Sequence, residues 1–382
     1  MKILYLIYFD LYNTQLIGVQ KKILSQINAL RKNGNVVDVA YCSDGKFIIE
    51  SVDETISIDV KKGFTNYRYS IYKYLSKNIK KLNYKQIYVR YPGSIEYYFY
   101  KTLKDLKKRG VDVYLELPTY PIGGELVNFL KSLIGDKKYI EFTLRLNIYI
   151  VHRILSRKIY KYIKKIVTFM PHDKVWGCDT VCIDNGINIE DFKLNVKKKY
   201  SNNKIVLLGV ANVAKWHGFD RVIEGLGEYY KDKQELEVEF RIVGDSDLID
   251  TLKSRVNELG ISDKVEFLGI KRGNELENEY YNCDIGVSSL GMHRIGIKNG
   301  STLKTKEYCG YGIPFIMAYK EKEINDNFKY CLNIDADESP VDIKDVVRFY
   351  NSLKKYNNIA KELNNFARDK YDWKKQMEKI FL

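Results

Sequence analysis

Short apolar segments alternate with amphipathic helical segments along this 382-residue sequence. Near its start, residues 2–8 form an apolar run, residues 18–33 place apolar side chains on one helical face, and residues 36–41 form a second apolar run. An apolar run without polar alternation is typical of a strand buried on both faces, and such strands belong to parallel sheets with helical crossovers. The sequence therefore predicts an α/β protein built from repeated βα units.

The same alternation starts afresh in the second half, after a lysine-rich stretch that we interpret as a linker. In the first half we expect further strands at 86–91, 111–117, 167–170 and 180–183, and helices at 95–109 and 144–166. In the second half we expect strands at 205–210, 238–243, 265–268, 284–289 and 313–318, and helices at 219–230, 247–259, 273–282 and 302–311. Two such series predict two doubly wound, Rossmann-like domains, at 1–190 and 191–365, with a C-terminal segment at 366–382. Open sheets of this kind bind ligands at the carboxyl ends of their strands, so we expect the ligand in an interdomain cleft.

Residues 299–314, NGSTLKTKEYCGYGIP, predict a loop, a short helix and a turn into a buried strand. Ser301 suits the N-cap, and Gly310 and Gly312 suit the helix exit. Lys304 and Glu307 lie three residues apart and share one helical face. Free backbone N–H groups, a cation and a carboxylate suit a ligand that carries both phosphate and sugar hydroxyls. The alternative interpretation is a surface salt bridge on an ordinary helix.

The loop at 209–218, GVANVAKWHG, follows a predicted strand and precedes a helix, and it places Lys215 and His217 where they can reach a phosphate. Near the N-terminus, Gly18 begins a helix and allows a ligand to approach the backbone, or simply forms a tight turn. Neither half contains GxGxxG or GxxxxGK[ST], so a dinucleotide fingerprint and a P-loop are both excluded. Asn185 and the glycine after it, in DNGIN, indicate a turn.

Three polar residues follow strands of the first half. Arg90 and Glu116 are expected at the carboxyl ends of strands, and Tyr120 on the loop that follows. Ligands bind at such positions in open α/β sheets. The alternative interpretation of each residue is a solvated loop position.

Positive charge is concentrated in one half of the chain. Residues 1–190 hold 31 Lys and Arg against 18 Asp and Glu, a net charge of +13, whereas residues 191–382 have a net charge of +1. Such a field indicates a negatively charged partner. No zinc-finger or RNA-binding signature is present, so we expect no nucleic acid and favour an anionic membrane surface.

The predicted helix at 144–166 contributes to this charge. It carries the apolar stripe Ile148, Leu155, Ile159, Tyr162 and Ile166. It also carries the basic residues Arg145, Arg153, Arg157, Lys161, Lys164 and Lys165. A basic amphipathic helix with aromatic residues is typical of an interfacial membrane contact. The alternative is a core-packed helix with a solvated face.

The remaining features indicate a cytoplasmic setting. The six cysteines are scattered and form no zinc spacing, which favours a reducing compartment without a metal site. The N-terminal apolar run is too short for a signal peptide, and no run approaches the roughly 20 residues that span a bilayer. We therefore expect a cytoplasmic protein that binds the inner membrane face peripherally.

Several of these motifs together resemble the bacterial members of the family-4 retaining glycosyltransferases, which have the GT-B fold. The resemblance runs nearly end to end. It is carried by IGVQKKILSQINALRKNG, LELPTYP, DNGIN, GVANVAKWHGFDRVI, FRIVGD, VEFLG, CDIGVSSLGMHR and STLKTKEYCGYGIPFI. It implies two Rossmann-like domains, a C-terminal helix that packs back on the first domain, and transfer of a sugar from a nucleotide-sugar to a hydroxyl acceptor. It implies retention of the anomeric configuration, and neither a metal nor a cofactor.

The resemblance also implies roles for individual residues. Lys215 matches a cation that binds the diphosphate, Leu303 and Lys304 match the loop and helix start that hold it, and Glu307 matches the carboxylate that binds the ribose. Gly18 matches the glycine that faces donor and acceptor, and Ile270 falls where backbone groups read the base. The other substrate-binding candidates are Asn185, Asn212, His217, Gly244, Arg294, Ser301, Thr302, Arg90, Glu116 and Tyr120.

The sequence departs from the family pattern at three places. Asn299 occupies the position of the first of two glutamates and supplies no charge, although its amide can bond a sugar hydroxyl. Asn212 stands where an arginine is common. Thr119 and Tyr120 occupy the place of a histidine. These departures bear on the donor sugar and on catalytic efficiency.

In the family's chemistry a nucleoside diphosphate leaves the anomeric carbon through an oxocarbenium-like state. Lys215 and Lys304, with the helix start, His217 and Arg294, would neutralise the charge. The resemblance predicts a transferase that takes a UDP- or GDP-sugar to a lipid-linked or polysaccharide acceptor in surface-polysaccharide synthesis. The alternatives are a non-catalytic GT-B partner protein, favoured by Asn299, and an epimerase or hydrolase of nucleotide-sugars. The sequence does not set the oligomeric state.

Overall fold

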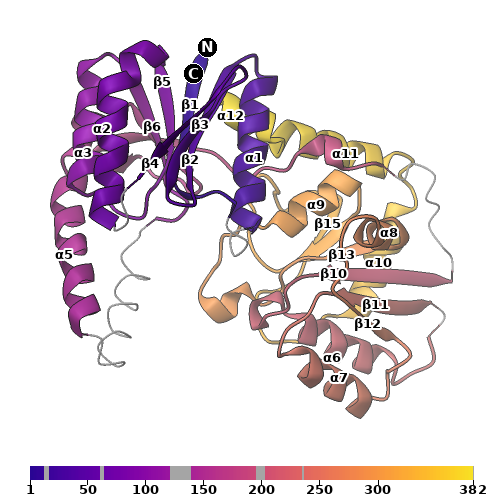
Figure 1. Ribbon diagram of the computed structural model, residues 1–382. Helices are drawn as coiled ribbons and strands as arrows, with labels where there is room; N and C mark the ends of the chain where they lie inside the picture. The colour runs from indigo at the N-terminus through magenta and orange to yellow at the C-terminus, as the bar shows by residue number, and fades with distance from the viewer. Residues whose placement is uncertain (13–16, 61–63, 121–138, 195–202, 235, 382) are drawn as a thin grey trace. The chain divides into compact units, whose positions relative to one another are not determined.

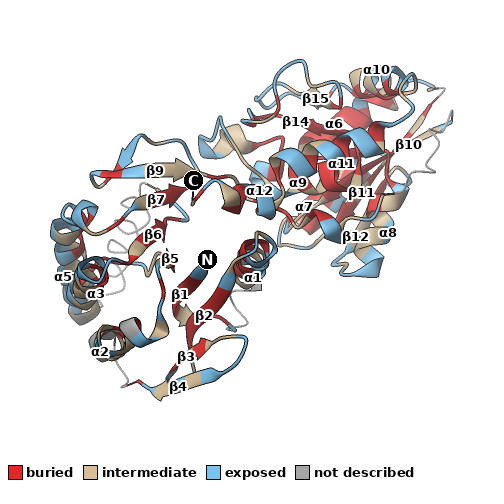
Figure 2. Cartoon of the chain, turned by 90° about the horizontal axis from the view of Figure 1, so that it is seen from above, coloured by how far each residue is buried: buried red, intermediate tan, exposed pale blue. Residues whose placement is uncertain are grey.

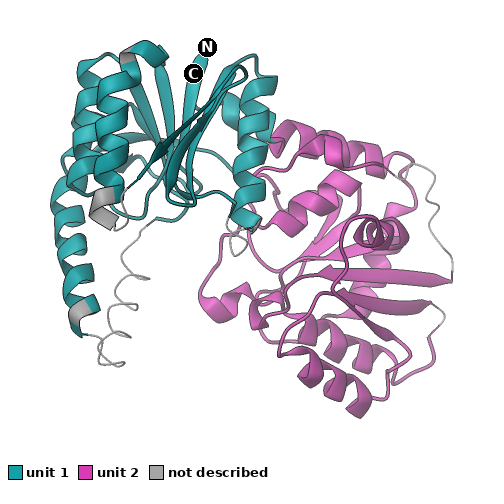
Figure 3. Ribbon diagram, in the orientation of Figure 1, with its two compact units in different colours: residues 1–184, 373–382 teal, residues 185–372 magenta. Residues whose placement is uncertain are grey.

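The computed structural model describes residues 1–12, 17–60, 64–120, 139–194, 203–234 and 236–381 (Figure 1). The chain forms two compact units (Figure 3): unit 1 contains residues 1–184 and 373–382, and unit 2 contains residues 185–372. The boundaries therefore lie at 184/185 and 372/373, whereas the sequence analysis placed them at 190/191 and 365/366. Packing explains the difference, because Ile187 and Ile189 belong to a core of unit 2 and Trp373 belongs to a core of unit 1.

Within the described residues, unit 1 is built on a nine-stranded sheet in the order β4-β3-β2-β1-β5-β6-β7-β9-β8. Its strands are β1 (Lys2–Asp10), β2 (Val36–Ser43), β3 (Lys46–Glu50), β4 (Thr55–Asp59), β5 (Gln86–Arg90), β6 (Asp112–Glu116), β7 (Lys165–Thr168), β8 (Lys174–Val175) and β9 (Cys178–Cys182). Neighbouring strands in the series β2-β1-β5-β6-β7-β9 pair in parallel. At the two edges, β3 pairs antiparallel with β2 and β4, and β8 pairs antiparallel with β9. Because β2 and β5 lie on opposite sides of β1, the sheet is doubly wound.

Two cores cover the faces of this sheet. Side chains of β1 alternate between them: Leu4 and Leu6 lie in one core, and Ile3 and Tyr5 lie in the other. This period of two follows from the strand geometry, and it explains why the strand is apolar throughout. The described α-helices of unit 1 are α1 (Ile17–Lys32), α2 (Phe64–Leu82), α3 (Tyr97–Lys108), α5 (Tyr139–Ser156) and α12 (Trp373–Glu378). Helices α2 and α3 contribute to the first core, and α1 and α12 to the second; Figure 2 shows the buried strands between them.

The hairpin from β2 to β4 was missed by the sequence analysis. Asp44 and Gly45 join β2 to β3 with positive φ values of 48° and 73°. Two central residues with positive φ are the signature of a type I′ turn, for which Asp-Gly is a strong sequence signal. The signal was therefore present in the sequence.

The predicted helix at 144–166 was wrong in its extent. Helix α5 ends at Ser156, a 3₁₀ turn (η2, Ile159–Lys161) follows, and Ile166 lies in β7. The predicted stripe thus belongs to three different elements. Burial of Ile159 and the entry into the sheet override the helical periodicity.

Unit 2 contains a parallel sheet in the order β12-β11-β10-β13-β14-β15 in the part that the structure describes. Its strands are β10 (Lys204–Val210), β11 (Glu237–Val243), β12 (Val265–Gly269), β13 (Ile285–Val287), β14 (Phe315–Met317) and β15 (Cys331–Asn333). Its helices are α6 (Phe219–Tyr229), α7 (Ile249–Glu258), α8 (Asn274–Asn282), α9 (Leu303–Tyr311), α10 (Ile343–Leu353) and α11 (Ile359–Lys370). Helices α6, α7 and α10 share one core, and α8, α9 and α11 share the other. The strand order reverses between β10 and β13, so the loops that follow these two strands flank the topological switch point.

Candidate functional site

The loops after β10 and β13 are joined at the carboxyl edge of the unit 2 sheet. The backbone N–H of Leu290 donates to the carbonyl of His217 over 2.9 Å, and that of Gly291 donates to the carbonyl of Trp216 over 3.1 Å. Gly218 permits this approach, because its φ is +66° and a Cβ there would lie 2.8 Å from the nitrogen of Gly291. The switch point is where open α/β sheets bind ligands, so these loops form the candidate site.

Helix α9 begins at this site, and its N-cap is Thr302 rather than Ser301. The Thr302 hydroxyl accepts a hydrogen bond from the backbone N–H of Thr305. It also lies 2.7 Å from the hydroxyl of Tyr319, which in turn contacts the hydroxyl of Ser288 at 3.1 Å. This buried hydroxyl cluster fixes the first turn of the helix. The remaining N–H groups of that turn and the positive end of the helix dipole would attract an anionic ligand. Gly312, with φ of +76°, ends the helix as predicted. The prediction of Gly310 at the helix exit was wrong: it lies inside α9, where a Cβ would come within 2.8 Å of the Phe192 ring.

Ser301 and Asn185 have a structural partner that the sequence analysis missed. Lys306 is fully buried, and its Nζ donates to the Ser301 hydroxyl over 2.6 Å and to the Asn185 carbonyl over 2.7 Å. Its ammonium group also lies over the Tyr371 ring, 5.0 Å from the centroid. Lys306 therefore ties the DNGIN turn to the loop before α9, and these contacts give Ser301 and Asn185 positioning roles.

Lys304 is the second residue of α9, and its amine is the most unusual group of the site. Its Nζ is buried and has no hydrogen-bond partner among the residues that the structure describes. The nitrogen lies 5.7 Å from the centroid of the Phe219 ring. Burial lowers the pKa of Lys304 to about 7, against the attraction of Glu307, which acts to raise it. An amine that donates to nothing is costly to bury, and a ligand oxygen would remove that cost.

His217 lies beside this amine and is neutral at pH 7. Its ring is buried, stacks on Phe219 at a centroid distance of 5.7 Å, and accepts a hydrogen bond at Nδ1 from the backbone N–H of Ala214. Burial, followed by the charge of Lys304, lowers the pKa of His217 to about 3. Because Nδ1 accepts, the hydrogen of the neutral ring is on Nε2, and His217 is a donor without charge.

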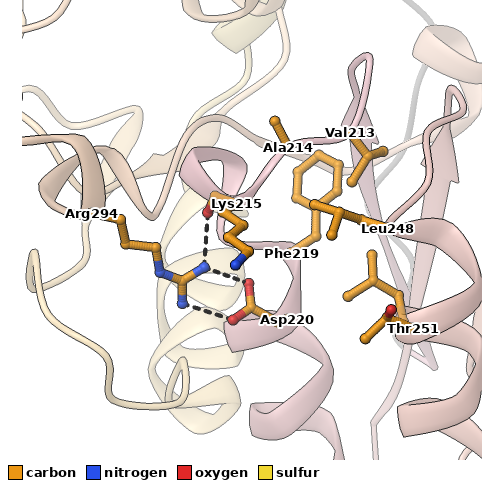
Figure 4. A pocket seen from close by; sticks show the side chains of 9 residues that line it. Val213, Ala214, Lys215, Phe219, Asp220, Leu248, Thr251 and Arg294 are labelled. Carbon is orange, nitrogen blue, oxygen red and sulfur yellow. Dashed lines mark hydrogen bonds and ion pairs between the residues drawn. The ribbon is translucent and has the colours of Figure 1, made fainter. Parts of the chain in front are cut away.

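Lys215 and Arg294 line a pocket of about 280 Å³ (Figure 4). Lys215 is exposed, and its backbone carbonyl accepts a hydrogen bond from Arg294 over 2.8 Å. Arg294 pairs with Asp220 through two hydrogen bonds of 2.9 and 2.7 Å, and it also binds Glu338. These bonds from Arg294 lower the pKa of Glu338 to about 2. Two carboxylates thus neutralise Arg294, and Lys215 is the less encumbered cation of the pair.

Glu307 lies one turn beyond Lys304 on α9. One of its carboxylate oxygens accepts a hydrogen bond from the Tyr280 hydroxyl over 3.0 Å, which fixes the carboxylate in place. The flanking candidates Asn212, Ile270, Asn299 and Leu303 are exposed, with fractions of 62% for Ile270 and 52% for Leu303. Exposed side chains around a held carboxylate and a buried amine are compatible with a site that admits a polar ligand.

The structure explains why position 244 is a glycine. Its φ is +130°, and a Cβ at this position would lie 1.6 Å from the carbonyl oxygen of Ala211. The glycine therefore allows the loops after β10 and β11 to meet at the edge of the sheet. This close approach explains the residue without contact to a ligand.

In unit 1, Arg90 and Glu116 lie at the ends of β5 and β6, as predicted, but they are buried and not solvated. They form an ion pair with each other, and Glu116 also accepts hydrogen bonds from Gln26 over 2.9 Å and from Tyr88 over 2.5 Å. Every second side chain of a strand points to the same face, so Arg90 and Glu116 lie on the face of Tyr88 and Tyr114, which belong to the core beneath α1. The pair is a buried structural network, and burial lowers the pKa of Arg90.

The other two candidates of unit 1 lie in different surroundings. Tyr120 packs against the rings of His172 and Trp176, with centroid distances of 5.0 and 6.1 Å. Gly18 is exposed near the start of α1, and a Cβ there would meet open space. Neither a tight turn nor a packing contact requires a glycine at position 18.

Arg221 of α6 is a residue that the sequence analysis missed. It is fully buried, and its guanidinium donates to the carbonyls of Leu290, Ser339 and Asp335 over 2.5, 2.7 and 2.9 Å. It thereby ties the loop after β13 to the segment between β15 and α10. A single arginine inside an amphipathic helix gives no sequence signal for this role.

Two classes of feature are absent from the residues that the structure describes. No group of three or more His, Cys, Asp or Glu side chains in the described ranges is arranged to hold a metal ion. None of the described helices is long and apolar enough to cross a bilayer.

Comparisons with known proteins extend this picture. Residues 191–318 match the family model "Glycosyl transferases group 1". A search of curated protein sequences found no significant match. Among solved structures, a glycosyltransferase from Rickettsia africae is similar with a TM-score of 0.63 and 15% identity, over 99% of this chain and 96% of that one.

Two further structures are similar over nearly their whole length. HepE from Anabaena, in complex with UDP, has a TM-score of 0.59 and 13% identity, over 100% of this chain and 98% of that one. The catalytic domain of starch synthase IV from Arabidopsis thaliana, bound to ADP and acarbose, has a TM-score of 0.58 and 8% identity, over 99% and 97%. These similarities confirm the predicted GT-B fold of two Rossmann-like sheets.

Proposed function

We propose that this protein is a glycosyltransferase that takes a sugar from a nucleotide-sugar and transfers it to a hydroxyl acceptor. The observation that carries the proposal is the Lys304 amine, which is buried, lacks a hydrogen-bond partner among the described residues and stands at the start of α9. The match of residues 191–318 to the glycosyltransferase model supports it. HepE and starch synthase IV, which share the fold, bind UDP and ADP.

In the proposed complex the diphosphate of the donor lies at the N-terminus of α9. The free N–H groups of the first turn donate to its oxygens, and Lys304 supplies a charge from within the protein. Lys215 approaches from the loop after β10, and His217 adds a neutral donor from the same loop. Glu307, fixed by Tyr280, accepts hydrogen bonds from the ribose hydroxyls.

The chemical step then needs neutralisation of the charge that develops as the nucleoside diphosphate leaves. An amine that is already desolvated interacts strongly with that charge, because little water screens it. We propose retention of the anomeric configuration and no role for a metal, in line with the resemblance to the family-4 enzymes. We also propose UDP- or GDP-sugars as donors and a lipid-linked or polysaccharide acceptor of a bacterial cell surface.

The test is to incubate the purified protein with UDP- and GDP-sugars and to measure release of nucleoside diphosphate, with and without a glycan or lipid-linked acceptor. We expect release with at least one donor and its loss in Lys304→Met. The matched control is Lys344→Met, because Lys344 is also the second residue of a unit 2 helix but is exposed. Absence of both binding and release with every nucleotide-sugar would overturn the proposal.

A second candidate function is a non-catalytic protein that binds nucleotide-sugars on the same fold. Asn299 favours it, because an exposed amide stands where the resemblance places a glutamate. If Asn299→Glu gains turnover from an inactive wild type, the protein has lost catalysis by this substitution. If the wild type is active, this candidate is excluded.

A further inference from the structure

Helix α5 exposes an apolar face that the sequence analysis did not find. Leu144, Ile150, Val151 and Ile154 are exposed by 59%, 47%, 38% and 53%. At about 100° per residue these four side chains lie within an arc of roughly 120° on one side of the helix, which also holds the exposed, uncharged Thr143 and Asn147. The predicted stripe through Ile148 and Leu155 adjoins this arc beside Leu144 and is partly buried.

The opposite edge of α5 holds the helix on unit 1. His152 and Ser156 are buried there, and the His152 Nδ1 accepts a hydrogen bond from the backbone N–H of Ile95 over 3.0 Å. The His152 ring also contacts Trp176, with centroids 5.3 Å apart. Because these contacts fix the rotation of the helix, the apolar arc is held outward and is not the result of a loosely attached helix.

Positive charge and aromatic rings border this arc. Arg153, Arg157 and Lys158 are exposed at the C-terminal end of the helix. Tyr139 begins the helix and Tyr160 follows it, with exposed fractions of 61% and 49%. Apolar side chains flanked by cations and tyrosines are the composition of a helix that lies in the headgroup region of a membrane. A solvated helix would place charged residues on its outer face, whereas Glu141, Arg145 and Arg153 of α5 lie outside the arc.

The geometry points to α5 as a docking surface for an anionic lipid bilayer, with Leu144, Ile150, Val151 and Ile154 in the apolar layer. The arginines and lysine beside them would contact lipid phosphates, each adding to the attraction of a half-chain with a net charge of +13. The biological role of this surface rests on the proposed function, because a membrane-bound transferase would meet a lipid-linked acceptor at the bilayer.

The test is co-sedimentation of the full-length protein with vesicles of phosphatidylglycerol and phosphatidylcholine. We expect binding to mixed anionic vesicles, and at least about tenfold weaker binding for the variant with Ile150→Ser and Ile154→Ser. Arg153→Gln with Arg157→Gln should weaken binding to anionic vesicles and reduce its dependence on salt. The matched control is Val52→Ser, because Val52 is an apolar residue of unit 1 that is 80% exposed but lies outside α5.

A fluorophore placed by Ile154→Cys tests insertion directly. We expect the emission of a water-exposed probe in solution and a blue shift on addition of anionic vesicles. An apolar environment without vesicles would mean that a second copy or another part of the chain covers α5, and it would overturn the inference. Equal vesicle binding by wild type and the isoleucine variants would do the same. Nucleotide-sugar binding is measured on the same variants without vesicles, so failure of the docking surface and failure of the proposed function are distinguishable.

Discussion

Replacing Lys304 by methionine should stabilise unit 2 while abolishing its proposed activity. The pKa of this amine falls from 10.5 to about 7 in the folded protein, mainly because it is buried. One pKa unit corresponds to about 1.4 kcal/mol, so the shift lowers the free energy of unfolding by about 4 kcal/mol at pH 7. Methionine fills a similar volume without a charge, so the substitution should recover this energy.

The sign of the pH dependence is fixed by the direction of the shift. Between pH 7 and pH 10.5 the unfolded state binds more protons at Lys304 than the folded state, so the stability of the wild type rises with pH. The gain from Lys304→Met should accordingly fall from about 4 kcal/mol at pH 7 to about 2 kcal/mol at pH 9.

Urea and thermal unfolding at the two pH values measure this effect. A gain of about 4 kcal/mol should raise the unfolding temperature of a unit of this size by about 10 °C. Lys215→Met is the control, because Lys215 is exposed and its loss should change stability by less than about 0.5 kcal/mol. Two results would contradict a buried Lys304 amine that lacks a hydrogen-bond partner among the described residues: destabilisation by Lys304→Met, or the same effect at pH 7 and pH 9.

Three further substitutions test the site. Gly244→Ala should lower the free energy of urea unfolding by more than about 3 kcal/mol, because its Cβ would collide with a carbonyl oxygen at a φ that alanine avoids. The control is Gly260→Ala, which should cost about 1 kcal/mol, because Gly260 also has a positive φ but a Cβ there meets open space. Arg221→Met leaves three backbone carbonyls without their donor and should lower the unfolding free energy by about 3–5 kcal/mol; unchanged stability would refute its anchoring role. Glu307→Gln should weaken nucleotide-sugar binding about tenfold in titration calorimetry with little loss of stability, and equal affinity would remove its ribose role. Binding that depends on protonated Lys304 should weaken by up to about 50-fold from pH 7 to pH 9, which a titration series checks.

Much of the fold could be predicted from the spacing of apolar residues along the sequence. Strand β1 and helix α1 were predicted within two residues of their ends, because a doubly buried strand and an amphipathic helix have distinct patterns. The break after Ser156 could not be predicted, since no glycine or proline marks it and the burial of Ile159 decides it. The turn at Asp44 could have been predicted from its Asp-Gly sequence.

The helix that carries Lys304 and Glu307 was predicted, but the surroundings of these side chains were not. Motif spacing placed Lys304 and Glu307 on one face of a helix, and the structure shows that arrangement. Spacing carries no information about which of two nearby lysines finds a partner. Lys306 bonds to Ser301 and Asn185, whereas the Lys304 amine has no hydrogen-bond partner in the part of the chain that the structure describes. Likewise Arg90 was placed at its strand end correctly, but only the packing of α1 over the sheet shows that it is buried.

The most direct test of the proposal is calorimetric titration with UDP- and GDP-sugars at pH 7 in buffers of different ionisation enthalpy. A sugar-linked diphosphate has no proton to exchange near pH 7, whereas Lys304, with a pKa of about 7, is about half protonated there. We predict uptake of about half a proton with each ligand bound, and loss of that uptake in Lys304→Met. Absence of binding, or binding with the same proton uptake in Lys304→Met, would contradict the assignment of this amine to the diphosphate.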